Sequence, residues 1–239
     1  MSRQGDVQRR AAEVGWAIPV PLYISNIICY ARMVLALYGL AISSSGRPVE
    51  TVVVFVVASL LDLVDGPLAR ALGQTSSLGI LLDIAADNIL RTCGWMAAVM
   101  SSCNTSDDAA GSSSTPLLPT IAAFIICVEW ITMLSTQLHA THSEQHWKSE
   151  REHDPWLVRA LFANNFRNPI GIVVIYGLFS SSLWAYGSHH PQIYDNIPLF
   201  DICKYLAYCG RALGLAVELW MIKGYLALVI LKDSIKKSD

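Results

Sequence analysis

The sequence predicts an all-α protein that crosses a membrane six times and forms a single domain over residues 1–239. The first observation behind this prediction is the composition: 53% of the residues are hydrophobic, only 15% are charged, and the mean hydropathy is +0.42. Soluble domains carry about 25% charged residues, so the deficit indicates a membrane protein. The second observation is a series of six apolar stretches, each close to the roughly 20 residues that a spanning helix needs.

The six stretches are separated by segments that break helices or carry polar residues. The first ends at a Ser-Gly-Arg-Pro turn that closes at Pro48, and a short turn over 71–77 follows the second. A Ser-rich loop over 104–119 follows the third, the longest polar stretch (142–168) follows the fourth, and a His- and Pro-containing segment precedes the last. The predicted spans are 24–43, 51–71, 78–101, 117–140, 169–187 and 204–226.

Lys and Arg residues gather on one side of these spans. They occur in the N-terminal segment, at Arg70 in the second turn, in the 142–168 loop and in the C-terminal tail, whereas the opposite side has Arg47 and little else. Because cytoplasmic loops are enriched in Lys and Arg, we expect both termini in the cytoplasm. The turn at Arg70 then faces the cytoplasm as well.

The same composition disfavours three other classes of protein. The N-terminal segment has arginines but no apolar core, so a cleavable signal peptide is not expected. None of the six cysteines forms a Cys-x-x-Cys pair, which argues against a zinc knuckle or a disulfide framework. No basic stripe is present, so nucleic acid is not an expected partner.

Four carboxylates interrupt the second and third apolar stretches. Asp62 and Asp65 are three residues apart, and Asp83 and Asp87 are four residues apart, so each pair lies on one face of a helix. The short turn over 71–77 should make the two helices antiparallel neighbours, which allows the two acidic faces to meet. Acidic side chains at membrane depth are costly and usually functional. Two divalent cations would neutralise these four, and oxygen ligands suit Mg²⁺, Mn²⁺ or Ca²⁺ rather than zinc.

Residues beside the carboxylates suit a diphosphate ligand. Arg70 places a planar cation one helical turn from the cluster, where it can bind a phosphate. Gly66 and Gly79 leave room for a ligand to approach the backbone. The chemistry that fits is in-line phosphoryl displacement assisted by metal ions. The alternative is a structural role, in intramembrane salt bridges or a proton or ion path, but Arg70 is the only base within 62–87, so most of the acids would stay unmatched.

At these residues the sequence resembles the CDP-alcohol phosphatidyltransferase family, whose signature is D-x2-D-G-x2-A-R-x8-G-x3-D-x3-D. The eight fixed positions are met by Asp62, Asp65, Gly66, Ala69, Arg70, Gly79, Asp83 and Asp87. The resemblance implies a six-helix bundle of the CDP-alcohol phosphotransferase type with a cytoplasmic site. It implies that Asp62, Asp65 and Asp83 bind two metal ions, Mg²⁺ or Mn²⁺, and that Asp87 completes the second ion's ligands and acts as the base. It also implies that Gly66, Arg70 and Ser76 contact the cytidine diphosphate part of the donor.

Within the family, the chain most resembles the eukaryotic phosphatidylinositol synthases. The first span, from Ser25-Asn26 to Tyr30-Ala31-Arg32, is similar to their P-N-x-x-x-Y-A-R opening, with Ser25 where proline is usual. This resemblance implies transfer of a phosphatidyl group from CDP-diacylglycerol to myo-inositol, in the membrane lipid of the endoplasmic reticulum, by a homodimer. Glu129-Trp130 and Asn164-Asn165 depart from the pattern, and both departures leave the acceptor open.

Five polar residues inside the spans each have two readings. Arg32 reaches the acceptor pocket or the donor phosphates, or it pairs structurally with a carboxylate. Asn26 contributes to the donor site or caps the start of its helix. Glu129 forms a polar wall of the pocket, paired with Arg32 or Lys148, or it is structural. Arg211 and Glu218 are seven residues apart, and we expect them to pair with each other or with neighbouring helices.

The leading functional hypothesis is therefore a membrane transferase that makes phosphatidylinositol and CMP. The same chemistry with glycerol phosphate, serine or an amino alcohol as acceptor is the main alternative. A divalent-cation channel or transporter is a second alternative, but a pore has no need of Gly66, Ala69 and Arg70 at their offsets. A catalytically inactive scaffold is disfavoured because all four carboxylates are present.

Overall fold

The computed structural model describes residues 19–106, 117–143 and 154–236, and these residues contain helices and no strand. The long helices correspond to the predicted spans. Each helix begins within a few residues of the predicted start, and the largest difference at an end is about ten residues, for the last helix. The first agrees with the prediction at both ends. The long helices are α2 (Ile24–Ser43), α3 (Pro48–Ala71), α4 (Ser77–Ser106), α5 (Leu117–Ser143), α7 (Pro169–Gly187) and α9 (Phe200–Lys236).

Short helical elements, which the sequence did not predict, connect some of the long helices. They are η1 (Val20–Leu22), α6 (Trp156–Phe162), η2 (Ala163–Phe166) and α8 (Pro191–Tyr194). Proline occupies the first position of α3, α7 and α8, where its missing amide proton costs nothing. Asn168 fixes the start of α7, because its Oδ1 accepts a hydrogen bond of 2.8 Å from the amide of Gly171.

Five of the described helices, α2, α3, α5, α7 and α9, contain segments long and apolar enough to cross a membrane. The prediction of six spans is confirmed only in part, because α4 is not among the five. Its length is sufficient, but Asp83, Asp87 and Arg91 lower its hydropathy. The helix that departs from the apolar pattern is therefore the one that carries half of the acidic cluster.

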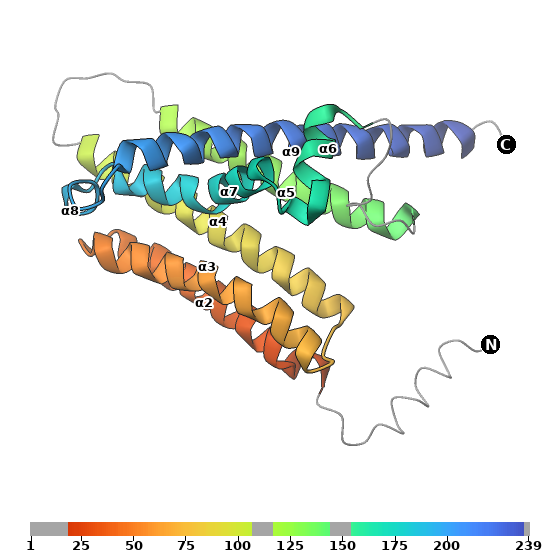
Figure 1. Cartoon of the computed structure of the whole chain (residues 1–239), viewed down its shortest axis with the longest axis horizontal. Helices are drawn as coiled ribbons and strands as arrows, with labels where there is room; N and C mark the ends of the chain where they lie inside the picture. The colour runs from red at the N-terminus through yellow and green to blue at the C-terminus, as the bar shows by residue number, and fades with distance from the viewer. Residues whose placement is uncertain (1–18, 107–116, 144–153, 237–239) are drawn as a thin grey trace.

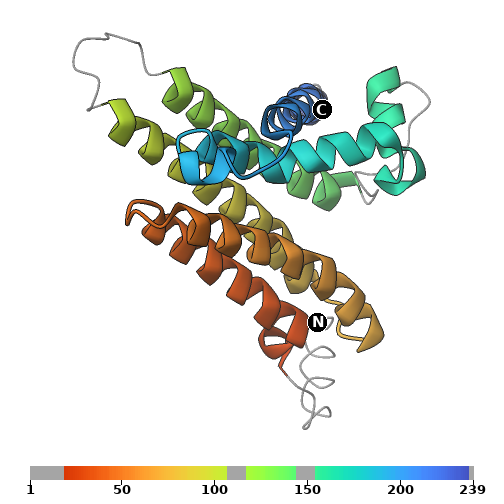
Figure 2. The ribbon, with the colours of Figure 1, turned by 60° about the vertical axis from the view of Figure 1, so that its left-hand side comes forward.

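The helices form two groups joined by α4. Figures 1 and 2 show α2 and α3 side by side, with α4 between this pair and the group of α5, α7 and α9. The pair α7 and α9 makes the most extensive contact, and α2 packs against both α3 and α4. Helix α4 thus contacts both groups, and residues on its different faces can contribute to sites on both sides.

Two glycines bring α7 and α9 into close contact. A Cβ atom added at Gly210 would lie 2.0 Å from the carbonyl oxygen of Val173, and one added at Gly177 would lie 2.3 Å from the amide nitrogen of Arg211. Neither position can accept a side chain without separating the helices. This close approach fixes the segment of α9 on which Arg211 is carried.

The main buried cluster holds the two groups together. Ala36 from α2, Phe55 from α3, Leu90 from α4 and Tyr186 from α7 are all less than 5% exposed and belong to one apolar core. The hydroxyl of Tyr186 also donates a hydrogen bond to the carbonyl of Ser43 at 3.3 Å. Ala58 of α3 and Leu90 of α4 belong to this core and lie about one helical turn from Asp62 and Asp87, so the core supports the acidic cluster from one side.

Candidate active site

The four aspartates of the signature converge on a single buried guanidinium group. Nη1 of Arg32 lies 2.8 Å from Oδ1 of Asp62, 3.0 Å from Oδ2 of Asp65 and 3.0 Å from Oδ1 of Asp83. Its Nη2 pairs with Oδ1 of Asp87. The side chain of Arg32 is fully buried, whereas that of Asp83 is 46% exposed. Of the two roles considered for Arg32, its contacts here are those of structural pairing with the carboxylates.

The predicted approach of the acidic faces of α3 and α4 is confirmed, since carboxylate oxygens of Asp62, Asp83 and Asp87 lie within 4.8 Å of one another. The two helices nevertheless contact each other much less than α2 contacts either of them. Asp62 and Asp65 lie on one face of α3, Asp83 and Asp87 lie on one face of α4, and Arg32 of α2 reaches both faces. The acidic faces do meet, but a third helix supplies the cation between them.

The carboxylates fit a divalent cation. One ligand atom from each of Asp62, Asp83 and Asp87 lies within 4.8 Å of the others, and Cys29, Asp65 and Asp83 form a second such group. Arg32 contacts all four carboxylates and Arg91 reaches only Asp87, at 4.0 Å, so the cluster keeps a deficit of positive charge that cations would remove. Carboxylate oxygens suit Mg²⁺ or Mn²⁺, whereas a thiol suits softer ions, so the group with three carboxylates is the better match.

A first pocket, here called the signature pocket, opens beside Asp65 and Asp83. Its volume is about 310 Å³, and its walls come from the start of α2, the end of α3 and the start of α4. The residues predicted to contact the donor and two of the aspartates lie together in its lining: Asn26, Gly66, Arg70, Ser76, Asp65 and Asp83. Arg32 is the exception, because it is buried among the aspartates.

Local structure explains how the small residues shape this pocket. The hydroxyl oxygen of Ser76 accepts a hydrogen bond of 2.9 Å from the amide of Gly79, as an N-cap does at the start of a helix. A Cβ atom at Gly79 would lie 2.9 Å from Oδ1 of Asn26, so glycine is required for this approach. A Cβ atom at Gly66 would meet only Nη1 of Arg70, at 3.6 Å, which leaves the space above Gly66 open.

Asn26 does not cap its helix, so that reading is wrong. The N-cap position of α2 is Tyr23, and Nδ2 of Asn26 donates a hydrogen bond of 2.7 Å to the carbonyl of Val20. Its Oδ1 is buried and has no hydrogen-bond partner in the described part of the chain. A polar atom of this kind beside a pocket is available to a ligand.

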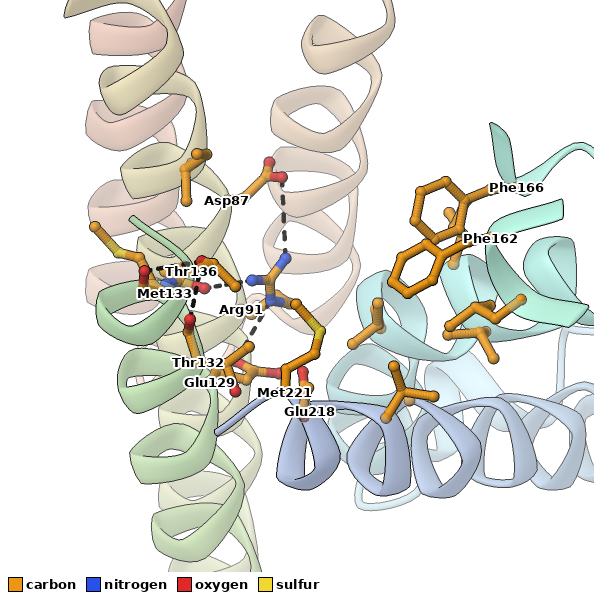
Figure 3. Close-up of a pocket in the computed structure, with 18 of the residues that line it drawn as sticks. Asp87, Arg91, Glu129, Thr132, Met133, Thr136, Phe162, Phe166, Glu218 and Met221 are labelled. Atoms are coloured by element: carbon orange, nitrogen blue, oxygen red, sulfur yellow. Dashed lines mark hydrogen bonds and ion pairs between the residues drawn. The ribbon is translucent and has the colours of Figure 1, made fainter. Parts of the chain in front are cut away.

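A second pocket, here called the Arg91 pocket, lies on the other side of Asp83. It is about 310 Å³ in volume and is lined by residues of α4, α5, α6, η2, α7 and α9. Figure 3 shows Arg91 between Asp87 and Glu129, with Phe162 and Phe166 on the opposite side. Asp83 lines both this pocket and the signature pocket, so the two cavities meet at the acidic cluster.

A buried chain of ion pairs extends from the acidic cluster through the Arg91 pocket. Nη1 of Arg91 lies 4.0 Å from Asp87, and its Nε lies 3.4 Å from Oε2 of Glu129. Nη2 of Arg211 lies 3.1 Å from Oε1 of Glu129, and its Nη1 donates a hydrogen bond of 3.0 Å to Glu218. The chain joins α4, α5 and α9.

These contacts decide two predictions made from the sequence. The pair between Arg211 and Glu218 is confirmed. The predicted pairing of Glu129 with Arg32 is wrong, because the aspartates surround Arg32 and Glu129 instead contacts Arg91 and Arg211. The other predicted partner, Lys148, lies outside the described residues.

Sequence reasoning missed two residues that touch the cluster. Arg91 extends the spacing of Asp83 and Asp87 by one more step of four residues, so the face of the helix could have revealed it. Cys29, whose Sγ is 3.7 Å from Oδ2 of Asp65, lies one helical turn before Arg32. A lone cysteine in an apolar span gives no signal of this kind.

A third cavity, of about 290 Å³, is almost entirely apolar. Leu60 and Leu63 of α3 and Ile175 and Phe179 of α7 line it, together with Asp62. An apolar chain in this space would end beside the acidic cluster.

Comparison with known proteins identifies the family to which the sequence belongs. The sequence model of the CDP-alcohol phosphatidyltransferase domain matches residues 22–197, which include α2 to α8 and the whole signature. The chain belongs to this family. No solved structure matches the chain.

The individual proteins that the chain resembles include enzymes named for two different acceptors. A CDP-diacylglycerol–inositol 3-phosphatidyltransferase of Arabidopsis thaliana is 28% identical over 147 residues, which are 62% of this chain and 59% of the relative. An enzyme of the same name from Drosophila melanogaster is 38% identical over 66 residues, 28% of this chain and 29% of the relative. A CDP-diacylglycerol–glycerol-3-phosphate 3-phosphatidyltransferase of Haemophilus influenzae is 40% identical over 73 residues, 30% and 38% of the two chains. The match thus spans about three fifths of the Arabidopsis relative's length.

Proposed function

We propose that this protein transfers a phosphatidyl group from CDP-diacylglycerol to a hydroxyl of myo-inositol and releases CMP. The observation that carries the proposal is the pair of pockets that meet at Asp83. In this proposal the signature pocket holds the cytidine diphosphate of the donor, and the Arg91 pocket holds the acceptor. The apolar cavity beside Asp62 suits an acyl chain of the donor.

Two divalent ions, Mg²⁺ or Mn²⁺, would be held by Asp62, Asp65, Asp83 and Asp87. When bound, they would supply positive charge that offsets the diphosphate and stabilises CMP as it leaves. Arg70, which lines the signature pocket, would bind a phosphate oxygen of the donor. Gly66, Ser76 and Asn26 would contact the cytidine part. Arg32 would hold the four carboxylates together on the donor side.

Asp87 is the residue proposed as the base. It lines the Arg91 pocket and belongs to the group with three carboxylates, so an acceptor hydroxyl can approach it. Asp87 would take the proton of this hydroxyl as its oxygen attacks the β-phosphorus of the donor. The bond between that phosphorus and the oxygen of CMP then breaks, and CMP leaves.

Replacing this base tests the assignment. Asp87→Asn should lower the rate of transfer by about a hundredfold or more, because general-base catalysis contributes roughly 10²- to 10⁴-fold. Binding of CDP-diacylglycerol, followed as thermal stabilisation of the purified protein, should persist. Asp201→Asn is the matched control, since that side chain is 74% exposed and pairs with Lys204 far along the chain from the signature. Full turnover in Asp87→Asn would show that another group takes the proton.

The runner-up acceptor is glycerol phosphate, which the similarity to the Haemophilus influenzae enzyme favours. An assay of lipid products with labelled inositol, glycerol phosphate and serine separates these acceptors. Phosphatidylinositol should form, and CMP release should depend on inositol. A product that requires glycerol phosphate or serine instead would refute inositol as the acceptor, and metal flux in liposomes without transfer would refute the enzyme.

The finer features of the proposal concern the membrane. We propose that α4 also crosses the bilayer, as the sixth span, with its charged residues facing the pockets. The signature pocket would open to the cytoplasm, in the endoplasmic reticulum, and the protein would be a homodimer. The concentration of Lys and Arg on one side of the spans supports the cytoplasmic orientation. The resemblance to eukaryotic phosphatidylinositol synthases supports the compartment and the homodimer.

A further inference from the structure

The charged groups of the Arg91 pocket are balanced once the aspartates of the signature are set apart. Of the described residues that line it, Arg91 carries positive charge, and Glu129 and Glu218 carry negative charge. Arg211 lies directly behind them and contacts both glutamates. Two cations therefore face two anions in the part of the pocket away from the cluster.

Glu129 is the group that both arginines share. It is 2% exposed, and its two oxygens lie 3.4 Å from Nε of Arg91 and 3.1 Å from Nη2 of Arg211. The two arginines come from α4 and α9, and α5 places the glutamate between them. A ligand phosphate that needed either arginine would have to displace a buried carboxylate, and it would lie close to that like charge.

We propose that Glu129 is a specificity-determining residue that restricts the acceptor to uncharged polyols and excludes phosphorylated alcohols. The inference rests on the proposed function, because it takes the Arg91 pocket as the acceptor site. It deepens that function by naming the chemical class that the pocket accepts and the residue that selects it. Arg91 and Arg211, which would otherwise bind phosphate, share the carboxylate of Glu129, and Glu218 supplies a second negative charge beside Arg211.

Uncharged polar groups in the same pocket suit hydroxyl ligands. Oγ1 of Thr132 and Nδ2 of Asn88 are buried and have no hydrogen-bond partner within the described ranges, and both residues line the cavity. Together they offer a donor and an acceptor to a polyol. The rings of Phe162 and Phe166, whose centroids are 5.1 Å apart, form an apolar wall against which the C–H face of a ring can pack.

Matched acceptor pairs test the inference independently of which alcohol is used. We would compare myo-inositol with myo-inositol 1-phosphate, and glycerol with glycerol 3-phosphate, in a CMP-release assay with CDP-diacylglycerol. The wild-type protein should have a higher kcat/KM for the unphosphorylated member of each pair that reacts. A higher value for the phosphorylated member overturns the inference, even if the alcohol is not inositol.

Glu129→Gln provides the second measurement. It should raise the ratio of kcat/KM for phosphorylated over unphosphorylated acceptor by about tenfold, chiefly through KM, because it removes the one carboxylate that contacts both arginines. Glu129→Asp should restore the wild-type ratio, which a role in packing alone would not require. Glu50→Gln is the matched control, since this glutamate is 58% exposed and pairs with Arg47. An unchanged ratio in folded Glu129→Gln overturns the inference.

The outcomes separate this inference from the proposed function. If CMP is not released with any acceptor, the proposed phosphatidyl transfer is refuted. The specificity of the pocket is then measured by the thermal stabilisation that each member of the same matched pairs produces. If Glu129→Gln does not fold, Glu218→Gln releases one contact of Arg211 while Glu129 stays in place, and it should raise the same ratio by a smaller factor. Stronger wild-type binding of the phosphorylated members would overturn the inference in either case.

Discussion

Removal of the buried cation tests how the acidic cluster is held together. In Arg32→Gln the four aspartates would face one another without the guanidinium group that contacts all four of them. Loss of one partner from a buried ion pair costs about 3 to 5 kcal/mol. Because the side chain of Asp83 is 46% exposed and that of Asp62 is 28% exposed, we expect the lower end, about 3 kcal/mol.

The cost should depend on divalent cations. With Mg²⁺ present, bound ions replace part of the missing positive charge, so the loss of stability should shrink. Thermal unfolding in detergent, with Mg²⁺ and with a chelator, measures both values. Arg47→Gln is the control, because Arg47 is 60% exposed in its pair with Glu50 and should contribute no more than about 1 kcal/mol. Equal destabilisation of Arg32→Gln in Mg²⁺ and in chelator would refute the idea that the cation and the metal ions neutralise the same carboxylates.

Two further predictions concern stability. Gly210→Ala should destabilise the protein by about 1 to 3 kcal/mol in thermal unfolding, because its Cβ would lie 2.0 Å from the carbonyl oxygen of Val173. Gly224→Ala is the control: beyond its own stretch of helix, its Cβ would meet no atom of the described residues within 4 Å, so it should be neutral or stabilising in the same assay. Burial and the adjacent His189 hold the pKa of His190 below its usual range, so the folded protein binds fewer protons than the unfolded chain and loses stability as the pH falls through about 6.5. Unfolding temperatures at about pH 7.5 and about pH 5.5 should therefore differ less in His190→Gln, and an unchanged difference would count against this assignment.

The long helices could be predicted because each is an apolar stretch bounded by clear breakers. Helix α2 agrees at both ends, and α3 begins three residues early because Pro48 is favoured at the first position of a helix. The short helices α6 and α8 could not be predicted, since they are too brief to show a period; α6 packs against α7, and α8 packs against α3 and α7.

The composition of the site could be predicted, but its connections could not. Fixed spacings placed Asp62 and Asp65 on one face and Asp83 and Asp87 on another, and these carboxylates do come together. Which cation lies between them depends on how α2 packs against α3 and α4, and no local pattern encodes that contact. The partners of Glu129 were unpredictable for the same reason, because they lie on two helices distant in sequence.

The central position of α4 has a mechanical consequence. Asp83 borders both cavities, and Asp87, one turn further along this helix, borders only the Arg91 pocket, so the offset between these two carboxylates is set by the rise of a single helical turn. Relative tilting of the outer helix groups in a thinner or thicker bilayer would change the mouths of the cavities before it changed that offset. The spacing of the reacting groups is thereby insulated from the lipid environment.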